Sequence, residues 1–172
     1  MKNVNMEEIN KFVDEAKINK QVLKKSMSVV VEWNMDESKP QVFSKVEFAK
    51  GSMNLESDQA PFMGGIGRAP NPIQYCLFGM ASCFAATFAS IAAEKGLEVD
   101  FFNVTAENNV NLSQTLGLSN EPIVEQVRLT VEIKSKADRK IIEEVQNLAL
   151  KRCPGIYCLR KPIPLETVLK NF

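Results

Sequence analysis

The hydrophobic pattern of the first third of the chain predicts a helix followed by strands. Apolar residues recur at helical spacing over residues 6–25, which predicts an amphipathic helix. Apolar residues alternate with other residues over 29–34, which predicts a first strand, and those of 42–48 predict a second. A turn at 36–40 is expected to join the two strands into a meander. Gly, Pro, Ser and Asn are frequent over 51–72, and we expect mostly loop there.

The most unusual feature is a long apolar run at residues 75–93, inside a helix predicted from Pro72 to about Glu94. A helix that is apolar all round is a buried helix. Its length would also cross a membrane, but the run is built from small residues and the rest of the chain is balanced in charge, so we expect no membrane. Because 172 residues can barely surround such a helix, we expect a partner subunit to cover it.

The pattern that follows this helix predicts two strands. Residues 97–112 form a long strand whose apolar phase shifts between Phe101 and Phe102, which predicts a bulge. Residues 113–122 are expected to be a loop. Apolar and polar residues then alternate strictly over 127–133, as in a strand with one buried face.

The chain is predicted to close with a helix and a strand. Ser135 can cap a helix that runs to about Arg152, and Pro154 disfavours helical geometry at Cys153. A short turn and a final strand at 165–169 complete the pattern. The order of these elements predicts an α+β fold with antiparallel pairing.

Composition limits the function more than the fold. The length suits one domain, and 21 basic residues balance 21 acidic ones, which argues against nucleic acid as a partner. No secretion leader is visible, so we expect a cytoplasmic protein. The chain has no histidine and therefore lacks the commonest general base. Its chemistry must use carboxylates, lysine, arginine, hydroxyls or its four cysteines.

The cysteines are Cys76, Cys83, Cys153 and Cys158. In a chain without a leader they indicate thiols or a redox pair and not a disulfide framework. Their spacing does not match the usual zinc pairs, so we expect neither a metal nor another cofactor. From the residues alone, Cys83 fits the role of a small apolar residue in a buried helix better than that of a reactive thiol.

Four short motifs resemble those of the OsmC/Ohr family: Gly64-Gly65, Pro70-Asn71-Pro72-Ile73-Gln74, Ala81-Ser82-Cys83-Phe84 and Arg152-Cys153-Pro154. The resemblance covers about 29–172, which leaves 1–26 as an amino-terminal helical extension and 27–172 as a single domain. It implies an intertwined homodimer in which antiparallel sheets wrap around long buried central helices.

The resemblance also implies a cysteine-dependent peroxidase that reduces organic hydroperoxides. By motif position, Cys83 would attack the peroxide, and Cys153 would resolve the product as a disulfide. A dithiol such as protein-bound dihydrolipoamide would then reduce that disulfide. In the full motif a Glu follows the Asn-Pro pair, where this chain has Ile73, and a hairpin arginine is also missing between residues 29 and 48.

These two departures leave the activity open. One hypothesis is a peroxidase with weak turnover; the other is a non-catalytic dimer that binds a small apolar ligand or acts as a thiol carrier or redox sensor. Arg68 is the nearest upstream cation, and it reaches Cys83 only if its loop folds back or comes from the other subunit. Gln74 either lines the site or caps the helix. Cys76 fits core packing, and Cys158 is a possible spare resolving thiol.

Overall fold

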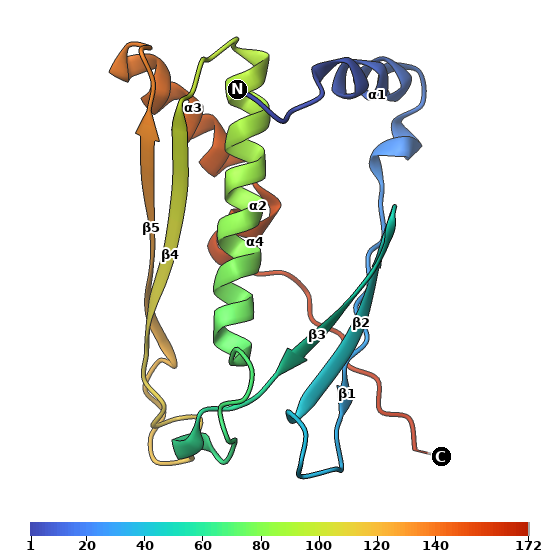
Figure 1. The fold of residues 1–172 in the computed structure, drawn as a ribbon, viewed down its shortest axis with the longest axis vertical. Coiled ribbons are helices and arrows are strands. Elements are labelled where there is room, and N and C mark those ends of the chain that lie inside the picture. The colour runs from blue at the N-terminus through green and yellow to red at the C-terminus, as the bar shows by residue number, and fades with distance from the viewer. Residues whose placement is uncertain (172) are drawn as a thin grey trace. The chain divides into compact units, whose positions relative to one another are not determined.

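The computed structural model describes residues 1–171, which form two compact units divided within the long helix α2 (Pro72–Glu94). One unit spans 7–78, and the other joins residues 1–6 to the chain from Gly79 onward. The expected boundary between residues 26 and 27 does not coincide with this division and stays a prediction. Each unit is described by itself below, with the elements labelled as in Figure 1.

The first unit contains a short helix and a three-stranded sheet. Helix α1 (Met6–Ile18) is followed by the 3-10 helix η1 (Lys20–Leu23), so the regular α-helix ends earlier than expected. The Asn19 side chain caps η1 by accepting a hydrogen bond from the Gln21 amide at 3.0 Å. Strand β1 is shorter than predicted, with only Glu32–Trp33 paired.

Strands β2 (Val42–Phe48) and β3 (Gly51–Ser57) form an antiparallel hairpin, and the loop expected from residue 51 is wrong for its first seven residues. Every residue of β2 pairs with one of β3, from Val42 with Ser57 to Phe48 with Gly51. Pairing with β2 satisfies the backbone hydrogen bonds of β3, so the strand forms although many of its residues are polar. Those polar residues are the reason that the sequence predicts a loop there. Sheet order is β1-β2-β3, and the 3-10 turn η2 (Pro61–Met63) follows.

The second unit places two strands and two helices on the carboxy-terminal part of α2 (Figure 1). Strands β4 (Phe101–Val110) and β5 (Val124–Lys134) pair antiparallel. Their register shifts between Asn109 and Val110, so the bulge predicted at Phe101 is wrong. The early part of the predicted strand, residues 97–100, lies in the connection between α2 and β4, where the Leu97 amide donates to the Ala92 carbonyl at 2.7 Å.

The carboxy-terminal helices also differ in detail from the prediction. Helix α3 (Arg139–Arg152) ends where predicted, but its cap is Asp138, whose carboxylate accepts from the Lys140 amide at 2.8 Å. Ser135 instead donates to the Glu98 carbonyl. A short helix α4 (Pro154–Arg160) replaces the expected turn, because a proline is favourable at the first position of a helix.

The final strand predicted at 165–169 is wrong for the single chain, since residues 161–171 form neither helix nor strand. A strand needs a neighbour to pair with, and its alternating apolar residues lack one here: Leu165 and Leu169 are 89% and 94% exposed. Alternation of apolar residues alone is therefore not enough to form a strand at 165–169.

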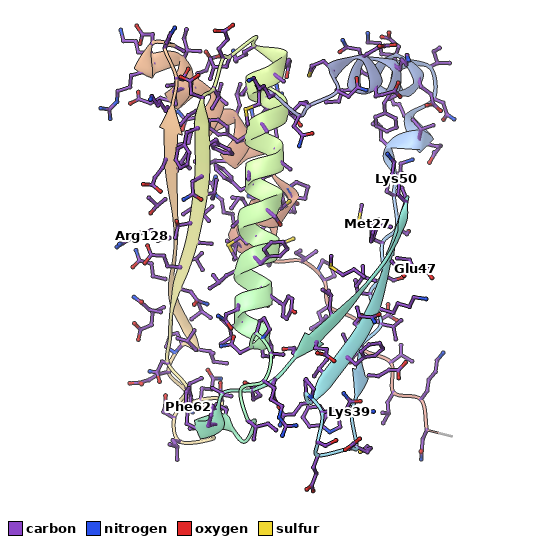
Figure 2. All side chains as sticks on the ribbon, viewed as in Figure 1. Met27, Lys39, Glu47, Lys50, Phe62 and Arg128 are labelled. Atoms are coloured by element: carbon purple, nitrogen blue, oxygen red, sulfur yellow. The ribbon has the colours of Figure 1, made fainter. Side chains whose placement is uncertain are left out.

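The hydrophobic core of the second unit lies where α2, the β4-β5 sheet and α3 meet. Phe88 is fully buried, and its ring stacks on Phe102 with centroids 4.7 Å apart. Figure 2 shows Arg128 on the opposite, outward face of β5. The fully enclosed core residues come from α2, α3, α4 and the connections between elements: Phe84, Phe88, Ile91, Ala92, Leu97, Val145, Ala149, Cys153 and Ile156.

Helix α2 is not enclosed by a single chain. Only Phe84, Phe88, Ile91 and Ala92 of it are buried, whereas Phe78 is 70% exposed. Among residues 1–171 it is also the one helix long and apolar enough to cross a membrane, a test that core helices of soluble proteins pass as well. The expected burial of this helix is therefore present along one face only.

Candidate active site

Cys83 lies midway along α2, one residue before the buried ring of Phe84. Asn71 and Gln74 form a capping box that stabilises the start of the helix. The backbone N–H of Asn71 donates to the Gln74 side chain, and the backbone N–H of Gln74 donates to the Asn71 side chain, both at 2.9 Å. The Cys83 side chain is only partly buried. A small molecule can therefore reach its sulfur more readily than that of a fully buried cysteine.

Cys153 is held between the end of α3 and the start of α4. Its amide donates to the Ala149 carbonyl at 2.9 Å, and its backbone is extended (φ −72°, ψ 121°), as expected for a residue that precedes proline. Its side chain is only 1% exposed. The Cys153 sulfur is therefore fixed inside the core.

The two sulfurs lie together despite 70 residues of separation. Cys153 Sγ is 3.5 Å from Cys83 Sγ, and both residues are free thiols. The prediction that these thiols meet in space is confirmed. A disulfide has an S–S length of about 2.05 Å, so closing the pair needs a movement of about 1.5 Å.

The surroundings of Cys83 favour the neutral thiol. Burial is the main cause that raises the pKa of Cys83, and the neighbouring Cys153 and Cys158 raise it further. The backbone N–H of Gly155 acts in the opposite direction and lowers it. Within the described part of this unit, no cation contributes to the pKa of Cys83.

The contribution of Gly155 is not predicted in the sequence analysis, because Cys153-Pro154 is taken there only as a helix end. Proline is also typical of the first position of a new helix, and the next backbone N–H in such a helix has no partner within it. That signal was present in the sequence, and it could have placed a donor beside the thiols.

The alkylation rate of Cys83 is expected to rise with pH, with a midpoint above the value of about 8.5 for an ordinary cysteine. The sign follows from burial, which disfavours the charged thiolate, and only the thiolate reacts. The measurement is iodoacetamide labelling against pH in a variant whose other three cysteines are serine. A midpoint below neutral would show that a cation acts on Cys83.

The other two site candidates are engaged in local interactions. The Arg68 guanidinium donates to the Ser38 carbonyl, and its amide donates to the Asp58 carboxylate at 3.1 Å. Gln74 caps α2 as described above. Both residues belong to the first unit, whereas the thiol pair belongs to the second. Their roles as binding residues stay predictions.

The remaining cysteines are both exposed. Core packing of Cys76 is therefore wrong for the single chain, because α2 is covered on one face only. Cys158 lies on α4 and is close enough to Cys83 to raise its pKa. Among residues 1–171, no group of three or more cysteine or carboxylate side chains is placed to hold a metal ion.

A groove of about 260 Å³ lies in the same unit as the thiol pair, and Phe84, the residue that follows Cys83, is among its lining residues. Its walls combine apolar side chains of β5 and the helices with the guanidinium of Arg160 and the amide of Gln146. A surface of this mixed kind suits a small organic ligand that is partly apolar better than a ligand that is entirely polar. The lining residues are Phe84, Val127, Leu129, Val131, Gln146, Leu150, Ile156, Leu159 and Arg160.

Comparison with known families gives one match. The model of a family described as OsmC-like protein matches residues 65–168, which include both thiols of the pair. The matched region begins later than the resemblance at residue 29 and extends over more than half of the chain. No curated protein matches the sequence.

Solved structures share the fold. An OsmC-like protein from Mycoplasma pneumoniae is 18% identical with a TM-score of 0.60, over 80% of this chain and 89% of that one. An organic hydroperoxide resistance protein OsmC from Legionella pneumophila is 20% identical with a TM-score of 0.58, over 80% and 92%. An OsmC-like protein of unknown function from Vibrio cholerae is 17% identical with a TM-score of 0.56, over 78% and 94%.

Proposed function

Because the chain belongs to the OsmC-like protein family, we propose that it is a thiol-dependent peroxidase that reduces organic hydroperoxides. The observation that carries the proposal is the separation of 3.5 Å between the sulfurs of Cys83 and Cys153. The organic hydroperoxide resistance protein from Legionella pneumophila, which shares this fold, supports the class of substrate. A groove in the same unit, lined by both apolar and polar side chains, supports it as well.

The proposed reaction begins at Cys83. Its thiolate attacks the peroxide oxygen, the O–O bond breaks, and Cys83 becomes a sulfenic acid while the alkoxide takes a proton and leaves as an alcohol. The Cys153 thiol then attacks the Cys83 sulfur and releases water, which leaves a disulfide. An external dithiol such as dihydrolipoamide reduces the disulfide and restores both thiols.

Burial supports this order of roles. Cys153 is 1% exposed and Cys83 only partly buried, so a hydroperoxide can approach Cys83 first. Turnover is expected to be slow, because burial raises the pKa of Cys83 and no cation among the described residues of its unit opposes this. Ile73, which replaces the family Glu, cannot orient a guanidinium. The proposal places the protein in the cytoplasm, where thiols stay reduced.

Cys153→Ser is expected to convert sustained turnover into a single reaction per chain. Without a resolving thiol at 3.5 Å, oxidised Cys83 accumulates as a sulfenic acid that dimedone labels. The measurement is cumene hydroperoxide consumption with a dithiol present, followed by mass spectrometry of the labelled protein. Cys158→Ser is the matched control, and turnover equal to wild type in Cys153→Ser would assign the resolving role to another thiol.

We further propose that the protein is a homodimer with α2 at its centre. The apolar face of α2 that a single chain leaves exposed includes Phe78, which is 70% exposed. Burying such a face favours association. Light scattering at micromolar concentration is expected to give twice the chain mass, and the unfolding midpoint is expected to rise with protein concentration. A monomer with a midpoint independent of concentration would contradict the proposal.

Binding of a small apolar ligand without turnover is a second candidate, and one observation favours it. The first unit contains a groove of about 380 Å³ with almost entirely apolar walls. A hydrophobic fluorescent probe that binds there, together with thiols unchanged by hydroperoxide, would favour this candidate. The lining residues are Val29, Val31, Val42, Ser44, Leu55, Glu56, Ser57, Pro72 and Tyr75.

A further inference from the structure

Gly155 lies in a helix, where the backbone conformation does not require glycine. It lies in α4, and its φ is not in the left-handed region, unlike those of Gly64, Gly67, Gly96 and Gly117. Alanine is intrinsically favoured over glycine in a helix. A glycine that lacks a conformational role needs another explanation.

The surroundings of Gly155 supply that explanation. A Cβ atom at this position would lie 3.3 Å from Cys83 Cβ, 3.5 Å from Cys83 Sγ and 3.8 Å from Cys153 Sγ. It would therefore touch both sulfurs, and its contact with Cys83 Cβ is tighter than the usual distance of about 3.5–4.0 Å between carbons. The missing side chain leaves space beside both thiols.

We propose that Gly155 is a positioning residue whose missing side chain leaves the Cys83 and Cys153 sulfurs room to close into a disulfide. The inference deepens the proposed function and rests on its assignment of these two thiols as a redox pair. Closure from 3.5 Å requires side-chain rotation of cysteines that the packed core otherwise holds in place. A methyl group at 155 would occupy the space beside both sulfurs and displace the Cys83 side chain from its present position.

The test is disulfide closure in Gly155→Ala, measured with a peroxide-independent oxidant. Diamide adds to one thiolate, and the second thiol displaces it, so that two thiols lose two electrons and two protons to the azo bond. In a Cys76→Ser, Cys158→Ser background, trypsin leaves one cysteine each in peptides 69–95 and 153–160. The linked peptide pair, quantified over time by mass spectrometry, reports the closure rate.

Closure in Gly155→Ala is expected to be about tenfold slower than in the parent. The matched control is Gly51→Ala in strand β3, where an added Cβ would meet only the Phe48 ring at the ordinary contact distance of 3.5 Å, and it should close within about twofold of the parent. Closure within about twofold of the parent in Gly155→Ala would overturn the proposal.

Two further readouts separate this proposal from simpler explanations. If reduced Gly155→Ala melts well below its parent, Gly155 has a general packing role and the proposal is overturned. If the parent consumes no hydroperoxide but Gly155→Ala still closes slowly with diamide, the peroxidase function fails while the positioning role stands.

Discussion

Cys83→Ser is expected to reduce hydroperoxide consumption at least about 100-fold, to the background of the assay. A serine hydroxyl is not ionised at neutral pH and cannot attack the peroxide oxygen as a thiolate does. Cys83 is also the one member of the pair that is partly exposed, so Cys153 cannot replace it efficiently. The measurement is dithiol-dependent loss of cumene hydroperoxide by a colorimetric peroxide assay.

Cys76→Ser is the matched control for this variant. Cys76 lies on the same helix α2, seven residues earlier, and its exposed thiol is free as well. Turnover in this control should equal that of wild type. If Cys83→Ser retains a substantial part of the activity and Cys76→Ser or Cys158→Ser loses it, the attacking thiol has been assigned to the wrong residue.

Phe88→Ala is expected to lower the free energy of unfolding by about 3–5 kcal/mol. Phe88 is completely buried, stacks on Phe102 at 4.7 Å and lies 6.3 Å from the ring of Phe84, so its removal leaves a cavity at the centre of the second unit. Urea denaturation of the reduced protein at a fixed concentration measures the change. A loss under about 1 kcal/mol would mean that this core is not well packed.

Phe62→Ala is the matched control for stability. Phe62 lies in the 3-10 turn η2, is 77% exposed and is labelled in Figure 2. A substitution at such a position is expected to change stability by no more than about 0.5 kcal/mol. A larger loss would show that another surface covers Phe62 in solution.

The sequence predicted the elements whose hydrophobic pattern is long and unbroken. Helix α2 and strand β5 have the expected type and nearly the expected bounds, because long regular patterns are determined mainly by local burial. The end of α3 at Arg152 followed from Pro154, whose ring disfavours a helical residue before it. The family resemblance at the motif positions also implies the pairing of Cys83 with Cys153, whose sulfurs lie 3.5 Å apart.

The sequence failed where structure depends on a neighbour. Strand β3 has few apolar residues and exists because β2 pairs with it along its whole length. The reverse holds at 165–169, where apolar alternation is present but the single chain supplies no strand to pair with. The space that Gly155 leaves beside Cys83 has the same dependence on a neighbour, since only the folded chain brings the two residues together.

The most direct test of the redox pair is the identity of the thiols lost when reduced protein meets one equivalent of cumene hydroperoxide. After alkylation of the remaining thiols, peptide mapping should show that two of the four cysteines are protected, with Cys83 linked to Cys153. Four alkylated cysteines would contradict peroxidase chemistry at this site. A link between Cys153 and Cys158 in place of Cys83 and Cys153 would contradict the assignment of the pair.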